Sequence, residues 1–281
     1  MKIGVSSYSF AHYMSQTGCD YLKICDLAAE MGYEAIEFTD LNEEVSKKPV
    51  NDTAKEIADH AAKLGLTVAA YTVGANLLAD DPEKEVARLK GCVDVAVLLG
   101  AKVMRHDCCW GPRKIARYTW LDAVKETAPR IREITEYAQT KGITTCTENH
   151  ATFMQDSNRV ETLIRTVDHP NYGWLVDMGN FICADEDSLH AVSIAAPYAV
   201  HVHCKDFLWK KGTEDNPGDG WFQSRGGHYL RGTILGHGVI PVKQCLKILE
   251  NAGYQGTVSV EFEGLEENLP ALESALKYLK R

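Results

Sequence analysis

The stretch KGITTCTENH at residues 141–150 contains the boundary between a predicted helix and a predicted strand. Apolar residues recur at helical spacing over 121–141, and a short β-branched run follows at 143–148. Gly142 lies between them, where glycine is favoured because it adopts the left-handed turn that ends a helix. The same boundary recurs at Gly32, Gly65, Gly100 and Gly253. These boundaries predict a regular alternation of helices and strands along the chain.

The alternation decides the fold class. Candidate strands occupy residues 3–7, 35–38, 67–71, 102–105, 143–148, 173–177, 200–205 and 257–261. Helical patterns occupy 21–31, 53–64, 83–99, 121–141, 159–167, 242–251 and 269–279, and the helix after the sixth strand is the least clear. Eight such units close into a barrel, and barrels of about 250 residues commonly form one domain. We therefore predict an α/β protein with a single (β/α)8 TIM barrel domain over residues 1–281, and an irregular, lid-like loop at about 207–238.

Composition and charge exclude several classes of partner. The chain has 45% hydrophobic and 25% charged residues and a formal net charge of −9, which opposes binding to nucleic-acid phosphates or anionic membranes. No apolar stretch reaches the length of about 18 residues that a membrane-spanning helix needs. Residues 1–5 enter a strand-like run without the features of an export signal. We expect a cytoplasmic protein with reduced thiols, in which the adjacent Cys108 and Cys109 are buried.

Active sites of such barrels lie at the C-terminal ends of the strands. Four consecutive predicted strands end on side chains that can bind a metal ion: Glu148, Asp177, His203 and Glu261. Each of these residues alone could be a helix cap or an ion-pair partner. Three carboxylates at one barrel mouth would repel each other without a cation, and an oxygen-rich set with one imidazole suits Mn²⁺, Mg²⁺, Co²⁺ or Zn²⁺. Together they predict one divalent metal site.

Several other side chains near the strand ends are candidates for substrate contacts. His150, Lys205 and His106 could bind a hydroxyl or act as a general acid. Trp110 could stack on a sugar ring, and Asp206 could orient Lys205 or a loop amide. On the seventh strand, alternation places His201 on the same face as His203, but further from the strand end. We interpret His201 as a packed or supporting residue.

The chain resembles the xylose isomerase-like barrel superfamily, particularly its sugar isomerase, sugar epimerase and inosose dehydratase branch. The resemblance is carried by Glu-Asn-His at 148–150, VDMGN at 176–180, HVHCKD at 201–206, LGHGVI at 235–240 and the segment 253–264. It implies one Mn²⁺-type ion bound by Glu148, Asp177, His203 and Glu261, with the two glutamates also acting as acid and base. Asn180, a candidate substrate contact, stands near the place where epimerases of this family carry a histidine. His237 and the long seventh loop also differ from the usual pattern, which favours a substrate unlike a free ketose.

Three functions are expected from these observations. The first is a metal-dependent sugar isomerase or epimerase that acts on a keto-sugar or related polyol ketone through an enediolate, with Glu148 and Glu261 as acid and base. The second is a dehydratase or eliminase acting on an inosose or a 3-keto-glycoside. The third is a non-catalytic sugar-binding or scaffold subunit beside an oxidoreductase. We expect a small sugar or cyclitol as ligand, Mn²⁺ as the first choice of metal, and either a monomer or a homo-oligomer.

Overall fold

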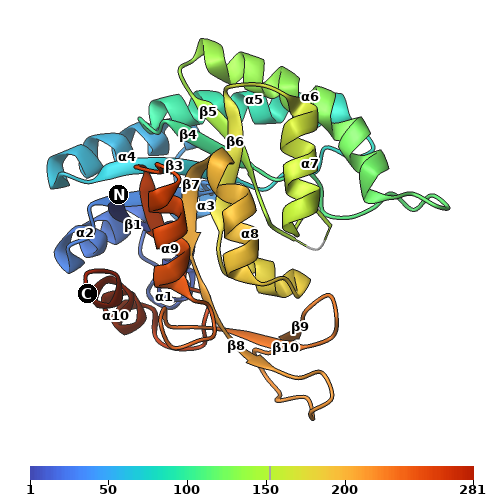
Figure 1. Ribbon diagram of the computed structural model, residues 1–281. Coiled ribbons are helices and arrows are strands. Elements are labelled where there is room, and N and C mark those ends of the chain that lie inside the picture. Colours follow the sequence, from blue (N-terminus) through green and yellow to red (C-terminus); the bar gives the residue numbers. More distant parts are fainter. Residues whose placement is uncertain (152) are drawn as a thin grey trace.

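Eight parallel strands close into a barrel in the computed structural model, which describes residues 1–151 and 153–281 (Figure 1). The strands are β1 (Lys2–Ser6), β2 (Ala35–Thr39), β3 (Thr67–Val73), β4 (Val103–His106), β5 (Thr144–Glu148), β6 (Tyr172–Asp177), β7 (Ala199–Cys204) and β11 (Thr257–Val260). Their order around the barrel is β1-β11-β7-β6-β5-β4-β3-β2. Each strand therefore pairs with its neighbour in this series, and the predicted TIM barrel is confirmed.

Helices surround the barrel on the outside (Figure 1). Those that were predicted are α2 (Tyr21–Met31), α4 (Val50–Leu64), α5 (Pro82–Leu98), α6 (Trp120–Thr140), α7 (Ser157–Val167), α9 (Val242–Asn251) and α10 (Asn268–Leu279). The five boundary glycines all have positive φ, between 71° at Gly142 and 91° at Gly253. The left-handed turn that favours glycine is thus present at each predicted boundary.

Short helices that the sequence did not clearly predict complete the barrel and its mouth. The sixth strand is followed by η2 (Asn180–Ala184), α8 (Ser188–Ala195) and η3 (Ala196–Tyr198). Two insertions follow the first strands: η1 (Ser7–Phe10) with α1 (Ala11–Thr17), and α3 (Glu43–Ser46). These elements have few turns, so the apolar spacing that reveals a helix has little room to repeat.

Three short strands interrupt the segment 207–238, which corrects the expectation that it is irregular throughout. Together with Asp206 it forms a three-stranded antiparallel sheet of β8 (Asp206–Lys210), β9 (Phe222–Gln223) and β10 (Tyr229–Thr233), in the order β8-β10-β9. Figure 1 shows this sheet extending from one side of the barrel. The Asp206 carboxylate accepts hydrogen bonds from the backbone N–H groups of Gly236, Gly238 and Ile240. Asp206 therefore organises loop amides at the base of the sheet.

The apolar core lies between the barrel and the helices. Large side chains such as Phe38, Met104 and Trp174 are fully buried there, and Cys108 and Cys109 are buried as well. In the described part of the chain, no helix is both long and apolar enough to cross a membrane. Several polar side chains are buried inside the barrel, and they lie around the predicted metal ligands.

Candidate metal centre and active-site cavity

The structure brings the four predicted ligands together at the C-terminal end of the barrel. Glu148 and Asp177 end β5 and β6, His203 lies on β7, and Glu261 directly follows β11. All four are buried, and one ligand-capable atom of each lies within 4.8 Å of those of the others. His203 Nδ1 lies 3.4 Å from Glu261 Oε2, 3.6 Å from Glu148 Oε1 and 3.9 Å from Asp177 Oδ2. The imidazole nitrogen thus faces three carboxylates.

Within the described part of the chain, three atoms of this cluster are buried without a hydrogen-bond partner, namely Asp177 Oδ2 and both ring nitrogens of His203. Burial, together with the charges of Glu148 and Glu261, raises the pKa of Asp177 to about 6, against the opposing effects of Lys205 and His203. A buried carboxylate surrounded by other carboxylates is costly unless a cation compensates it. Carboxylate oxygens and one imidazole nitrogen are ligands that a divalent ion accepts. The residues present therefore fit a divalent metal ion.

Glu37, on β2, is a site residue that sequence reasoning missed. Its Oε1 lies 2.7 Å from His203 Nε2, and its Oε2 contacts His201 Nε2. Burial raises the pKa of Glu37, but the two histidines outweigh it and hold the pKa below its ordinary value. A carboxylate behind a histidine fixes the ring orientation of a metal ligand and raises its basicity. The available signal was a charged residue in the middle of the apolar strand at 35–39.

Glu37, His201 and His203 form a second group whose ligand-capable atoms lie close together. His201 Nε2 also lies 3.3 Å from Ser259 Oγ, deeper in the barrel. In this group one carboxylate faces two imidazoles, so it lacks the converging carboxylates of the first group. His201 therefore has the supporting position that its place on the strand suggested.

Arg105 holds one oxygen of Glu148. Its Nε donates to Glu148 Oε2 at 2.7 Å, while Glu148 Oε1 accepts from Asn180 Nδ2 at 3.1 Å and faces His203. Burial raises the pKa of Glu148, but Arg105 and His203 outweigh it and hold the pKa below its ordinary value. The structure thus keeps Glu148 ionised and leaves one of its oxygens directed at the cluster.

Lys205 lies against the opposite glutamate. Its Nζ is 2.5 Å from Glu261 Oε2, 3.2 Å from Asp177 Oδ2 and 3.4 Å from Glu263 Oε2. It also donates to Asn180 Oδ1 at 3.3 Å. Asn180 therefore connects the Glu148 side of the site to the Lys205 side, which is a closer link to the cluster than its sequence position alone indicated.

A polar cavity of about 230 Å³ opens above this cluster, with Glu148, Glu261, His150 and Lys205 in its lining. His150 Nδ1 lies 3.0 Å from Asp107 Oδ1. Burial lowers the pKa of His150, but the bond to Asp107 and the charge of Glu148 raise it above its ordinary value. Two of the predicted substrate contacts thus reach the cavity together with both predicted acid–base glutamates.

The other three predicted substrate contacts, Asn180, His106 and Trp110, do not line this cavity. Alternation along β4 turns His106 away from the face that carries Arg105, so His106 is fully buried and stacks on Tyr172 with a centroid separation of 6.2 Å. Trp110 is 65% exposed and does not line the cavity. The positions of His106 and Trp110 therefore correct the expectation that both face a sugar.

Comparison with known proteins is consistent with this architecture. A family model described as a xylose isomerase-like TIM barrel matches residues 25–281. Inosose dehydratase from Clostridium perfringens (strain 13 / Type A) is 26% identical over 155 residues, which are 55% of this chain and 50% of that protein. The match thus spans about half the length of this curated relative.

Two solved structures share the fold across nearly the whole chain. The probable 3-DHS dehydratase AsbF from Bacillus anthracis has a TM-score of 0.77 and 19% identity, covering 100% of this chain and 99% of that one. The D-psicose 3-epimerase from Clostridium cellulolyticum H10 has a TM-score of 0.74 and 16% identity, covering 100% and 98%. At these identities the likeness concerns the fold, whereas the family match extends over most of the sequence. The chain belongs to the xylose isomerase-like TIM barrel family.

Proposed function

We propose that this protein is a divalent-metal-dependent isomerase or epimerase that moves a proton at a carbon next to the carbonyl of a keto-sugar or related polyol ketone. The observation that carries the proposal is the convergence of Glu148 and Glu261 on His203 Nδ1, at 3.6 and 3.4 Å, from strands β5 and β11. A sugar-binding or scaffold subunit has no need of two buried carboxylates directed at one point. The convergence therefore favours an enzyme.

The residues that would hold the metal are Glu148, Asp177, His203 and Glu261, with Mn²⁺ as the first choice and Mg²⁺, Co²⁺ and Zn²⁺ as alternatives. A divalent ion supplies Lewis acidity, which polarises a carbonyl and stabilises the charge that develops on its oxygen when a neighbouring proton leaves. Glu37 would support this set by orienting His203.

The two glutamates have different neighbours, which suggests different roles in proton transfer. Arg105 holds Glu148 in its ionised form, which a group that accepts a proton from the substrate carbon requires. Glu261 lies beside the Lys205 ammonium, whose protons are within hydrogen-bonding distance. The Glu261–Lys205 pair can therefore return a proton on the other side of the substrate.

A dehydratase is the second candidate, and the His150–Asp107 pair favours it. Loss of a β-hydroxyl requires a general acid for the leaving oxygen. His150 lines the cavity, and its raised pKa increases the fraction that is protonated near neutral pH. The partial likeness to an inosose dehydratase supports an inosose as substrate for this reaction, and a 3-keto-glycoside is the alternative.

We also propose that the sheet of β8, β9 and β10 covers the substrate on one side. Phe222 and Gln223 of β9 line a cavity of about 370 Å³ together with His150, Asn180 and Lys205. Phe222 is 40% exposed, so its ring is available to a ligand. This part of the predicted lid segment therefore adjoins the proposed substrate contacts.

The test is turnover of ketoses, inososes and 3-keto-glycosides in D₂O with Mn²⁺ present. We expect Glu261→Gln to abolish turnover with the fold retained, whereas the exposed Glu273→Gln is the matched control and stays active. Removal of metal by a chelator should abolish turnover, and Mn²⁺ or Co²⁺ should restore it. Full activity of the chelated protein contradicts the proposal.

The same experiment separates the two reactions. Deuterium incorporation without loss of water or aglycone indicates isomerisation or epimerisation, whereas loss of either indicates elimination. His150→Gln should leave proton exchange in place and suppress elimination, since only the second reaction needs an acid for the leaving group. Equal loss of both by this variant would contradict the role given to His150.

A further inference from the structure

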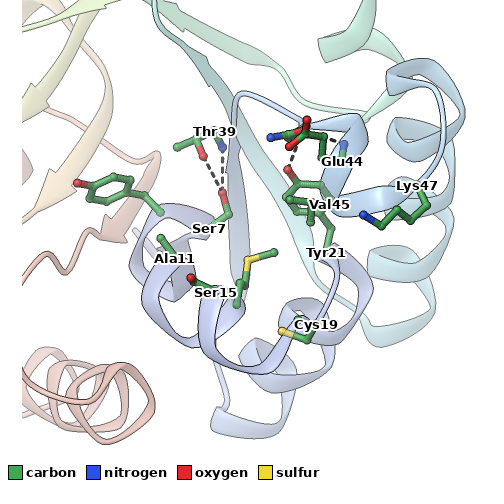
Figure 2. A pocket seen from close by; sticks show the side chains of 13 residues that line it. Ser7, Ala11, Ser15, Cys19, Tyr21, Thr39, Glu44, Val45 and Lys47 are labelled. Carbon is green, nitrogen blue, oxygen red and sulfur yellow. Dashed lines mark hydrogen bonds between the residues drawn. The ribbon is translucent and has the colours of Figure 1, made fainter.

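A second cavity adjoins the proposed catalytic cavity at the ends of β1 and β2 (Figure 2). Its volume is about 470 Å³, whereas that of the catalytic cavity is about 230 Å³. Tyr8 and Thr39 line both cavities. Tyr8 is 45% exposed, so its ring is not packed into the protein interior at this boundary. A ligand bound at the carboxylates therefore has a larger space directly beside it.

Insertions after the first two strands form the walls of this second cavity. Ala11, Met14 and Ser15 come from α1, and Val45 comes from α3. Figure 2 shows Ala11 and Val45 on opposite sides of the space. Both helices are additions to the eight strand–helix units that close the barrel. The chain thus has extra structure at this side of the mouth, outside the strands that form the barrel.

Several polar groups of the wall are bonded to one another. Thr39 N donates to Ser7 Oγ at 2.9 Å, and Asn42 N donates to Tyr21 Oη at 2.9 Å. Glu44 N donates to Asn42 Oδ1 at 2.7 Å. The hydrogen-bonding capacity of these groups is therefore partly used within the protein.

Apolar groups line the cavity as well, beside the exposed charged side chains of Glu44 and Lys47. Met14 and Val45 are half-buried and pack against the core, so each still presents surface to the cavity. The rings of Tyr8 and Tyr21 add two aromatic surfaces, and aromatic rings pack favourably on one another in offset or edge-on arrangements. This lining has fewer charged side chains than that of the catalytic cavity next to it, and its apolar part suits a flat apolar group.

We propose that the second cavity binds an aryl group attached to the sugar, so that the substrate is an aryl glycoside of a keto-sugar rather than a free ketose. The proposal rests on the proposed function of the adjacent site. A free ketose would place its hydroxyls among the charged residues and leave the larger, apolar cavity to water. An aryl glycoside places hydroxyls in the polar space and its ring in the apolar space, which matches each group to its surroundings.

The test measures binding rather than turnover. The full chain with Mn²⁺ is titrated calorimetrically with pairs of 4-nitrophenyl and methyl β-glycosides of glucose, galactose and xylose. In at least one pair we expect the aryl glycoside to bind about tenfold more tightly, because burial of an aromatic ring removes apolar surface from water. Ala11→Phe and Val45→Phe fill the cavity from opposite walls. Each should remove the aryl advantage and leave binding of the methyl glycosides unchanged.

Gln16→Phe is the matched control, because it adds the same side chain to α1 at an exposed position outside this cavity. It should retain the aryl advantage, and thermal melts check that all three variants fold. Equal affinities within all three pairs, or no detectable binding of any aryl glycoside, would overturn the proposal. So would an aryl advantage that survives in both Ala11→Phe and Val45→Phe.

The two proposals fail in different ways. If only the subsite is wrong, the wild-type protein exchanges deuterium into keto-sugars but shows no preference for the aryl glycosides. If only the proposed function is wrong, the aryl preference and its loss in the variants persist without exchange or turnover.

Discussion

Replacement of Glu37 by glutamine tests the arrangement of the candidate metal centre. This carboxylate is fully buried on β2 and lies 2.7 Å from His203 Nε2. The opposite nitrogen, Nδ1, faces the carboxylates of Glu148, Asp177 and Glu261 at 3.4–3.9 Å. Glutamine preserves the volume of the side chain but removes the negative charge behind the imidazole. His203 should then be a poorer ligand.

The expected loss of metal affinity follows from this geometry. Carboxylates behind a ligating histidine contribute about 10- to 100-fold to metal affinity or activity, which corresponds to about 1.4–2.7 kcal/mol. Glu37 should lie toward the upper end of this range, because it has no solvent exposure and its charge is poorly screened. We therefore expect the Kd for Mn²⁺ to rise by about 30- to 100-fold.

The assay is titration of the protein with Mn²⁺, with free Mn²⁺ measured by electron paramagnetic resonance. Glu30→Gln, at an exposed position of α2, makes the same chemical change away from the barrel and should bind like the wild type. Circular dichroism checks the fold. A Kd of Glu37→Gln within about twofold of the wild type would refute the supporting role of Glu37, since a carboxylate in this role should contribute at least about tenfold.

Three further predictions concern stability. Chelation should lower Tm and excess Mn²⁺ should restore it, because a ligand at 100 times its Kd adds about 2.7 kcal/mol; a Tm independent of metal contradicts this. Arg105→Met removes the counter-ion of buried Glu148, so urea unfolding should show a free energy of unfolding lower by about 3–5 kcal/mol. A decrease below about 1 kcal/mol would contradict the role of Arg105 as counter-ion. Gly173→Ala should cost about 1–3 kcal/mol because its Cβ would collide with Val200. Gly91→Ala, in a helix with open space around it, should instead stabilise by about 0.5–1 kcal/mol, and equal effects of the two alanines would contradict the packing argument.

The sequence by itself determined the barrel and the identity of the strand-end residues. Helix-ending glycines and short β-branched runs are local signals, because each reflects the conformational preference of a few neighbouring residues. The C-terminal ends of parallel strands meet at one side of a barrel. Glu148, Asp177, His203 and Glu261 could therefore be grouped without knowledge of any distance between them.

Only the tertiary structure decided what surrounds that group. Glu37 and His203 are far apart in the sequence, and their contact depends on the closure of the barrel. The side chain of His106 turned outward because the start of β4 sets the phase of its alternation. The sheet of β8, β9 and β10 depends on pairing between segments that each have weak signals. The cavity beside Tyr8 arises where two short insertions meet, and such shapes follow from packing in three dimensions rather than from the spacing of residues along the chain.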